Sequence, residues 1–239
     1  MLLKRSMLHE NRTFIFMRKC VVSALVGIFS FSYLKAQTKN VWGGAGWFAA
    51  GYTVLTGHES LREALEAKGL SLSRSLSGFL IGGGGGAYLG RVFVGGYGEA
   101  VSGEKLNGGY GFFRMGYFWR LGNRFILLPM IGIGGGGYTF TVSGRPAQVD
   151  FSQAIEPGSG IPPRSLSAGG AKGSVSLALQ YFNKAFMIGF EAGYGRSLSE
   201  FQEWETAGIS LQNGPNITPQ QLYFRLLIGG GGFVLEGKN

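Results

Sequence analysis

Residues 185–198 read AFMIGFEAGYGRSL, and this stretch alternates between two kinds of residue. Large or apolar residues occupy every second position from Phe186 to Tyr194, whereas small residues and Glu191 occupy most of the positions between them. Successive side chains of a β-strand point to opposite faces of the sheet. The stretch therefore predicts a strand with one apolar face and one face of small or charged residues.

Seven further stretches are similarly rich in glycine, aromatic and branched residues. The eight predicted strands are 41–54, 76–88, 91–102, 108–119, 124–142, 170–182, 185–198 and 220–235. Most gaps between them alternate between tight turns and long loops, and the long ones are 55–75, 143–169 and 199–219. Only the gap 103–107 is short where the alternation predicts a long loop. Tight turns at one end and long loops at the other are typical of up-and-down barrels in bacterial outer membranes.

The composition agrees with a membrane protein that has no spanning helix. Hydrophobic residues make up 45% of the chain and charged residues only 15%. Beyond the N-terminus no uninterrupted apolar run reaches the roughly 18 residues that a transmembrane helix needs. Because backbone groups in lipid need internal partners, a spanning protein without such helices must form a closed barrel. Composition alone also allows a secreted β-protein.

The N-terminal region has the features of an export signal. Met17-Arg18-Lys19 is basic, residues 20–33 are apolar but too few for a membrane span, and Ala36 precedes an expected cleavage site. We expect translation to start at Met17 and residues 1–36 to be a leader. Residues 37–239 would then form a single barrel domain.

Removal of the leader changes the charge and the available chemistry. It leaves 16 basic and 12 acidic residues, a net charge of +4 instead of +9, so nucleic acid is not an expected partner. The remaining chain has no cysteine, which excludes disulfides and cysteine-based metal sites, and one histidine, His58. A Ser–His–acid site would need His58 with a serine such as Ser60 or Ser102, and no cue links them. We predict no catalytic residue, no cofactor and no metal.

The same alternation in other strands places charged residues on the inward face. The interior of an eight-stranded barrel is just wide enough for side chains to fill it. Buried charges need partners, so we predict a structural network of ion pairs in the lumen. The alternatives are a proton or ion path and a catalytic cluster, and nothing in the spacing favours them. The predicted members are Glu99, Arg114, Lys172, Glu191 and Arg225.

Glycine runs and aromatic residues have a structural interpretation. The runs 82–86, 134–137 and 229–232 are not phosphate-binding loops, because no Lys-Ser/Thr follows them and none opens a helix. In a small, curved barrel we expect glycines to allow bends and to leave room for inward tyrosine and phenylalanine rings. Aromatic residues near strand ends predict belts at the membrane surface. They are Trp42, Trp47, Tyr88, Trp119, Tyr138, Tyr181 and Phe182.

Two loops carry features that could serve binding. Thr56 and Glu59 have the spacing of a capping box and predict a helix over about 58–68. Leu61 and Leu65 would pack this helix against the loop rim, although it could also form a lid or bind a partner. In loop 199–219 an exposed Trp204 among acidic residues could bind a partner or a sugar, or pack on the loops. The candidate loop contacts are therefore His58, Leu61, Leu65 and Trp204.

The export signal, the eight alternating segments and glycine-dense strands such as FLIGGGGGAYLGRVFVGGYGEA (79–100) resemble the small outer-membrane barrels of the OmpA/OmpX-like group. The resemblance implies an all-β, eight-stranded antiparallel transmembrane barrel in the outer membrane of a Gram-negative bacterium. It also implies a monomer that contacts outer-membrane lipid and lipopolysaccharide and is inserted by the outer-membrane assembly machinery. That machinery favours a terminal aromatic residue, and this chain departs there, since VLEGKN follows Phe233.

The function expected from these features is non-enzymatic. Such a barrel would anchor long extracellular loops for surface binding, adhesion or envelope integrity. One alternative is a lipid-modifying enzyme of the same architecture, as in the lipid A deacylases and palmitoyltransferases, although no residue of those families is carried over to this chain. A small solute channel and a secreted barrel that binds an apolar ligand are two further alternatives.

Overall fold

The structure, a computed structural model, describes residues 41–122, 124–144, 165–183, 185–206 and 209–235. The predicted leader, its cleavage site and most of the predicted loop 143–169 lie outside the described residues. Within the described part, no helix is both long and apolar enough to cross a membrane.

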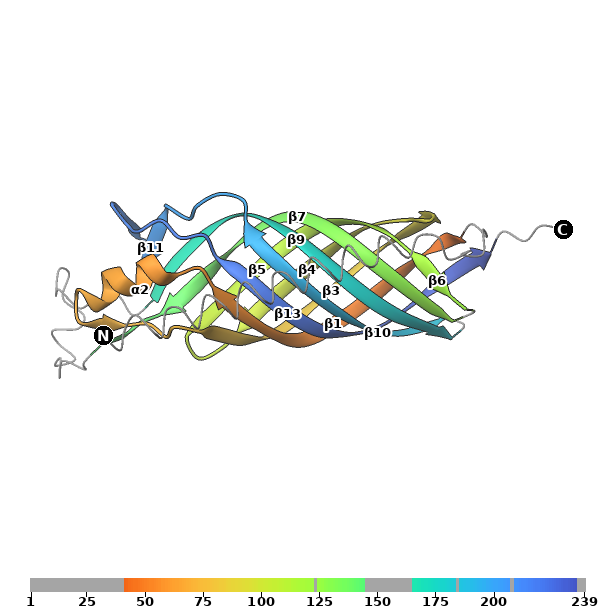
Figure 1. Ribbon diagram of the computed structural model, residues 1–239, viewed down its shortest axis with the longest axis horizontal. Helices are drawn as coiled ribbons and strands as arrows, with labels where there is room; N and C mark the ends of the chain where they lie inside the picture. Colours follow the sequence, from red (N-terminus) through yellow and green to blue (C-terminus); the bar gives the residue numbers. More distant parts are fainter. Residues whose placement is uncertain (1–40, 123, 145–164, 184, 207–208, 236–239) are drawn as a thin grey trace, which may run out of the picture. The chain divides into compact units, whose positions relative to one another are not determined.

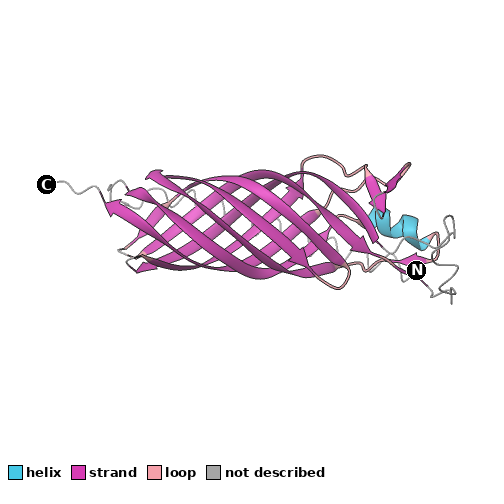
Figure 2. Cartoon of the chain, turned by 180° about the vertical axis from the view of Figure 1, so that it is seen from behind, coloured by secondary structure: helices cyan, strands magenta, loops and turns pink. Residues whose placement is uncertain are grey.

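Eight long strands form a closed barrel. Each strand pairs antiparallel with two neighbours, and the first strand pairs with the last, from Val41 opposite Leu235 to Thr56 opposite Gln220. The tilted strands wrap around one axis in Figure 1 and Figure 2. The predicted fold class, an all-β, eight-stranded antiparallel up-and-down barrel with a short helix in its first long loop, is confirmed. The wall strands are β1 (Val41–Thr56), β3 (Leu76–Gly90), β4 (Val92–Ser102), β5 (Leu106–Tyr117), β7 (Phe125–Thr141), β9 (Ser165–Asn183), β10 (Phe186–Ser197) and β13 (Gln220–Leu235).

Tight turns join the strands at one end, which we call the turn end. Gly90 and Gly122 occupy two of these turns with φ of 68°, a conformation that residues with a Cβ rarely adopt. Regular strand structure is interrupted at Phe118, directly after β5. Phe118 is buried and packs edge-on against Tyr88. A short strand, β6 (Trp119–Leu121), follows the interruption and pairs with β7.

The opposite, loop end carries the remaining elements. These are α2 (Glu59–Glu66), β2 (Leu70–Ser71), β8 (Ser143–Gly144), β11 (Trp204–Thr206) and β12 (Ile209–Leu211). The pairing of β2 with β8 ties two loops together, and β11 pairs with both β12 and β9. Figure 1 shows α2 and β11 at the end of the barrel opposite β6. The predicted capping box is wrong: Thr56 still belongs to β1, and the helix begins after His58, whose side chain makes no capping hydrogen bond.

The two faces of the wall differ as the alternation predicts. All eight strands expose large apolar side chains outward, among them Phe48, Ile131, Phe190 and Phe224. The inward positions of the same strands are mostly buried. The wall is therefore apolar outside, while its inner face carries every buried charged residue among the described ones.

Four of the predicted belt aromatics are on the wrong face. Trp47, Tyr88, Tyr138 and Phe182 are all buried at inward positions. Tyr138 is an even number of residues from the inward Gly132, and this parity, not nearness to a strand end, selects the face. The belt prediction was wrong for these four because it used only their position along the strand.

Glycines make room for the inward rings. A Cβ on Gly86 would lie 2.6 Å from Cζ of Phe93, and a Cβ on Gly134 would lie 2.8 Å from Cδ1 of Phe112. Real Cβ atoms do not approach other atoms so closely, so a larger residue would push the ring or the strand away. The expectation that glycines accommodate inward rings is confirmed at these positions.

Candidate functional site

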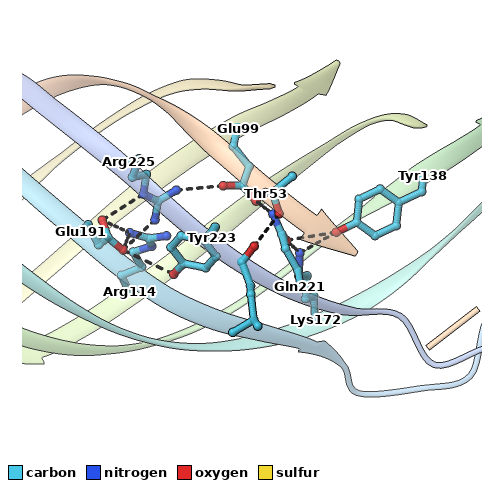
Figure 3. A network of polar contacts seen from close by, with 10 residues as sticks. Thr53, Glu99, Arg114, Tyr138, Lys172, Glu191, Gln221, Tyr223 and Arg225 are labelled. Atoms are coloured by element: carbon cyan, nitrogen blue, oxygen red, sulfur yellow. Dashed lines mark hydrogen bonds and ion pairs between the residues drawn. The ribbon is translucent and has the colours of Figure 1, made fainter. Parts of the chain in front are cut away.

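The five predicted lumen charges are all buried inside the barrel, and Glu191 on β10 is at the centre of the cluster. Arg225, its direct partner on β13, donates from Nε to Oε2 at 3.1 Å and from Nη2 to Oε1 at 2.7 Å. Arg114 on β5 donates from Nη1 to Oε1 at 2.9 Å. Because β5 and β10 are not neighbours in the sheet, this contact spans the lumen (Figure 3). Glu191 therefore joins opposite parts of the wall.

Arg225 also binds a second carboxylate. Its Nη1 donates to Oε2 of Glu99 on β4 at 2.8 Å. The Tyr97 ring lies beside both cations, 4.0 Å from Cζ of Arg225 and 4.4 Å from Cζ of Arg114. Two arginines and two glutamates from four strands thus neutralise one another around an aromatic ring. We call Glu99, Arg114, Glu191 and Arg225 the lumen cluster.

Lys172 differs from the other lumen charges. Among the described residues it has no carboxylate within ion-pair distance. Its Nζ donates instead to Tyr138 Oη at 2.9 Å and to Gln221 Oε1, and it lies 4.2 Å from the centre of the Tyr110 ring. Gln221 connects it to the lumen cluster, since its Nε2 donates to Glu99 Oε1 at 3.5 Å. The structure therefore places Lys172 in a polar and aromatic site next to the ion pairs.

Sequence reasoning missed the neutral partners of these charges. Gln221 and Tyr223 have the same parity as the inward Arg225, and the Tyr223 hydroxyl lies 3.4 Å from Glu191 Oε1. Parity was the signal that could have found them. The role predicted for the charges, structural support of the lumen, stays a prediction that substitutions can test.

The four candidate loop contacts are buried together at the loop end. Leu61 and Leu65 are the buried residues of α2. The Phe140 ring on β7 lies 6.4 Å from the His58 ring and 6.0 Å from the Trp204 ring. We call the buried loop side chains the loop cap; they are His58, Leu61, Leu65, Leu72, Phe201, Trp204 and Ile217.

Trp204 is not the exposed binding residue that the acidic surroundings suggested. It is 1% exposed, and its Nε1 donates to the Pro215 carbonyl at 2.8 Å. Its backbone pairs with Ala168 of β9. This pairing turns the indole inward, with Glu205 exposed beside it. Of the two interpretations of Trp204, packing on the loops is confirmed, and an exposed binding residue is not.

His58 has no catalytic geometry with the serines considered for it. Its Nε2 lies 2.9 Å from the Ser73 carbonyl oxygen. Ser60 donates to the Asn216 carbonyl at 2.7 Å, and Ser102 donates to Asn107 at 3.4 Å. A nucleophilic serine needs its histidine within hydrogen-bond reach, and neither of these contacts supplies one.

Comparison with known proteins identifies similar solved structures only. No protein-family model matches the chain, and no curated protein matches it. The attachment invasion locus protein Ail of Yersinia pestis is 13% identical, with a TM-score of 0.40 over 80% of this chain and 98% of that one. Neisserial surface protein A is 8% identical, with a TM-score of 0.46 over 78% and 96%. The outer membrane protein OprG of Pseudomonas aeruginosa is 11% identical, with a TM-score of 0.31 over 82% and 97%.

The barrel assignment rests on the strand pairing of this chain. The first strand closes on the last, and every wall strand has two antiparallel neighbours. The sequence identities and TM-scores are too low for the functions of those proteins to be assigned to this chain.

Proposed function

We propose that this protein is a non-enzymatic bacterial outer-membrane barrel that anchors its loops at the cell surface for binding, adhesion or envelope integrity. The observation that carries the proposal is the distribution of polarity, with large apolar side chains outside on every strand and charged side chains buried inside. A soluble protein has the reverse arrangement, since large exposed apolar patches on monomers are rare. A closed barrel in lipid has its apolar band outside.

The interior supports an anchor in preference to a solute channel. The lumen cluster links β4, β5, β10 and β13 across the barrel. Inward rings, including Tyr97 and Tyr110, occupy the same region. At the loop end, the loop cap packs apolar side chains against the barrel. These contacts stabilise the wall and hold the loops in place, which suits a scaffold that presents a surface.

Two isoleucines test the membrane location. Ile131 on β7 is 64% exposed and Ile209 on β12, in a loop, is 65% exposed. If the wall contacts lipid, Ile131→Arg should lose about 2–4 kcal/mol of folding free energy in bilayers, the cost of arginine near the midplane. Ile209→Arg should change it little, because this loop side chain would remain in water. Urea unfolding in phosphatidylcholine vesicles measures both variants.

Equal effects of the two substitutions would argue against lipid around β7. Fractionation of cells, with gels of boiled and unboiled protein, supplies a second measurement. We expect an outer-membrane band whose mobility changes on heating. Recovery of folded protein in the soluble fraction would overturn the proposed location.

Planar-bilayer recording distinguishes the anchor from the channel. We expect the reconstituted wild-type protein to be electrically silent, because side chains occupy the lumen. Steady single-channel conductance would contradict the anchor and favour the channel.

A further inference from the structure

The two ends of the barrel carry different charges. Among the described residues, the turn end has three charged side chains beyond the lumen, Arg91, Arg120 and Arg124, and no carboxylate. The loop segments 57–75, 103–107 and 196–206 mix seven glutamates with five lysines and arginines. Within the described part of the chain, basic residues thus outnumber acidic ones at the turn end but not at the loop end.

Contacts with tyrosines place two of these arginines beside the outer surface of the wall. Arg91 Nη1 donates to the Tyr117 hydroxyl at 2.9 Å, and Arg124 Nη1 donates to the Tyr181 hydroxyl at 3.0 Å. Both tyrosines belong to the outward-facing set of their strands. A guanidinium has five N–H donors, so one bond to a tyrosine leaves donors for a further acceptor.

The residues form a continuous arc along the turn end. The strands β4, β5, β7 and β9 are successive neighbours in the sheet. Val92, next to Arg91, pairs with Tyr117, and Phe125, next to Arg124, pairs with Tyr181. Trp119 lies 5.9 Å from the Tyr117 ring, and Phe125 lies 5.2 Å from the Tyr181 ring. We call Arg91, Arg124, Tyr117 and Tyr181 the arginine arc.

We propose that the arginine arc binds the phosphate groups of anionic glycerophospholipids in the leaflet at the turn end. The inference rests on the proposed membrane location. Tyrosine and tryptophan lie at the level of lipid headgroups, and here Tyr117 and Tyr181 hold guanidinium groups at that level. Arginine matches phosphate oxygens with two parallel hydrogen bonds. The two guanidinium groups at the outer surface favour an anionic headgroup over a zwitterionic one.

Lipid titration of the folded full-length chain tests the proposal. The protein is folded in neutral detergent, and phosphatidylglycerol or phosphatidylcholine is added before native mass spectrometry counts the bound lipids. We expect wild type to retain phosphatidylglycerol preferentially. Each arginine near an anionic lipid surface contributes about fivefold in affinity, so R91Q/R124Q should bind phosphatidylglycerol at least fivefold more weakly. Its binding of phosphatidylcholine should not change.

Two further variants sharpen the test. K68Q/R74Q removes the same charge from two exposed positions at the loop end and should bind phosphatidylglycerol as wild type does. Y117F/Y181F keeps the arginines but removes the hydroxyls that position them, so we expect an intermediate loss. Inorganic phosphate added in equal concentration should not displace the lipid.

The outcomes separate this inference from the proposed function. A heat-modifiable, membrane-inserted barrel without preference for phosphatidylglycerol would overturn the lipid site and leave the location standing. Equal losses in R91Q/R124Q and K68Q/R74Q, or displacement by inorganic phosphate, would overturn it as well. A chain that folds in solution and does not insert would refute both proposals.

Discussion

The middle of the lumen and the loop end are both buried, but their chemistry is opposite. The lumen cluster consists of charged side chains from the wall strands, tied by ion pairs of 2.7–2.9 Å. The loop cap consists mainly of apolar side chains from segments between the strands. A buried charge needs its partner, whereas an apolar side chain needs only neighbours of suitable shape. The two regions should therefore differ in how they respond to substitution.

The largest effect is expected in the lumen cluster. Arg225→Met removes the cation that binds both Glu99 and Glu191. Glu191 keeps Arg114, but Glu99 keeps only the 3.5 Å contact from Gln221. Breaking a buried ion pair in this way costs about 3–5 kcal/mol, and urea unfolding of the folded barrel measures the loss.

Arg225→Lys is the matched control. It keeps the positive charge but cannot reproduce the forked contact with Glu191 and the contact with Glu99 together, so a smaller loss is expected. If Arg225→Met unfolded at the wild-type urea concentration, the lumen cluster would not stabilise the barrel.

The lumen was predictable because strands have a strict two-residue period. Glu191 lies between Phe190 and Ala192 in a stretch whose alternation assigns every face, and Arg225 follows the same rule. The rule could not supply the pairing of particular charges. Which strands face each other across the lumen depends on closure of the barrel, so the contact between Arg114 and Glu191 and the neutral partners of Lys172 emerged only in the structure.

The next effect is expected in the loop cap. Trp204→Ala removes a fully buried indole, a change that typically costs 3–5 kcal/mol in a protein core. We expect about 3 kcal/mol here because adjacent loop segments can partly fill the space. The loss should weaken the packing of the loops but not the barrel wall. Limited proteolysis should therefore cut the variant faster within 199–219, while the urea midpoint of the barrel stays near that of wild type.

Leu198→Ala provides the control for this experiment, since Leu198 is 59% exposed in the neighbouring segment. It should be cut at the wild-type rate. A drop in the barrel's urea midpoint for Trp204→Ala would show that the loop cap and the wall unfold as one unit.

The loop cap was less predictable than the lumen. The apolar spacing of Leu61 and Leu65 identified the helix and its buried face, because an α-helix has its own period. The orientation of Trp204 was left open because the strand β11 is only three residues long. Such a short element gives too few positions to establish a period, and its pairing with β9 is a tertiary contact that decides which way the indole points.

A smaller effect is expected from a glycine that leaves room for a lumen ring. A Cβ on Gly134 would meet the Gly111 carbonyl oxygen and lie 2.8 Å from Cδ1 of Phe112, whereas a Cβ on Gly111 would meet nothing within 4 Å. Gly134→Ala should lose about 2 kcal/mol through overpacking. Gly111→Ala, on the paired strand, should be close to neutral. Urea midpoints in the same detergent compare them, and equal midpoints would mean that the ring and the neighbouring strand move aside without cost.

The smallest effect is expected from an ion pair in the helix of the loop end. Arg62 Nη1 lies 2.6 Å from Glu66 Oε1, closer than the lumen ion pairs, but the two side chains are 17% and 50% exposed. Exposed pairs four residues apart in a helix contribute about 0.3–0.5 kcal/mol, because water screens the charges and both side chains lose freedom. A double-mutant cycle with Arg62→Ala and Glu66→Ala, measured through proteolysis of the loops, gives this coupling energy.

The coupling should fall further as salt is added, since exposed charges are screened, whereas the lumen pairs should respond little. A coupling energy as large as the loss expected for Arg225→Met would mean that the distance between the charged atoms governs the strength of these ion pairs. The expected difference of about tenfold in free energy would instead show that burial governs their strength. The same two side-chain types, at nearly the same distance, would then stabilise the barrel strongly in the lumen and contribute little at the loop end.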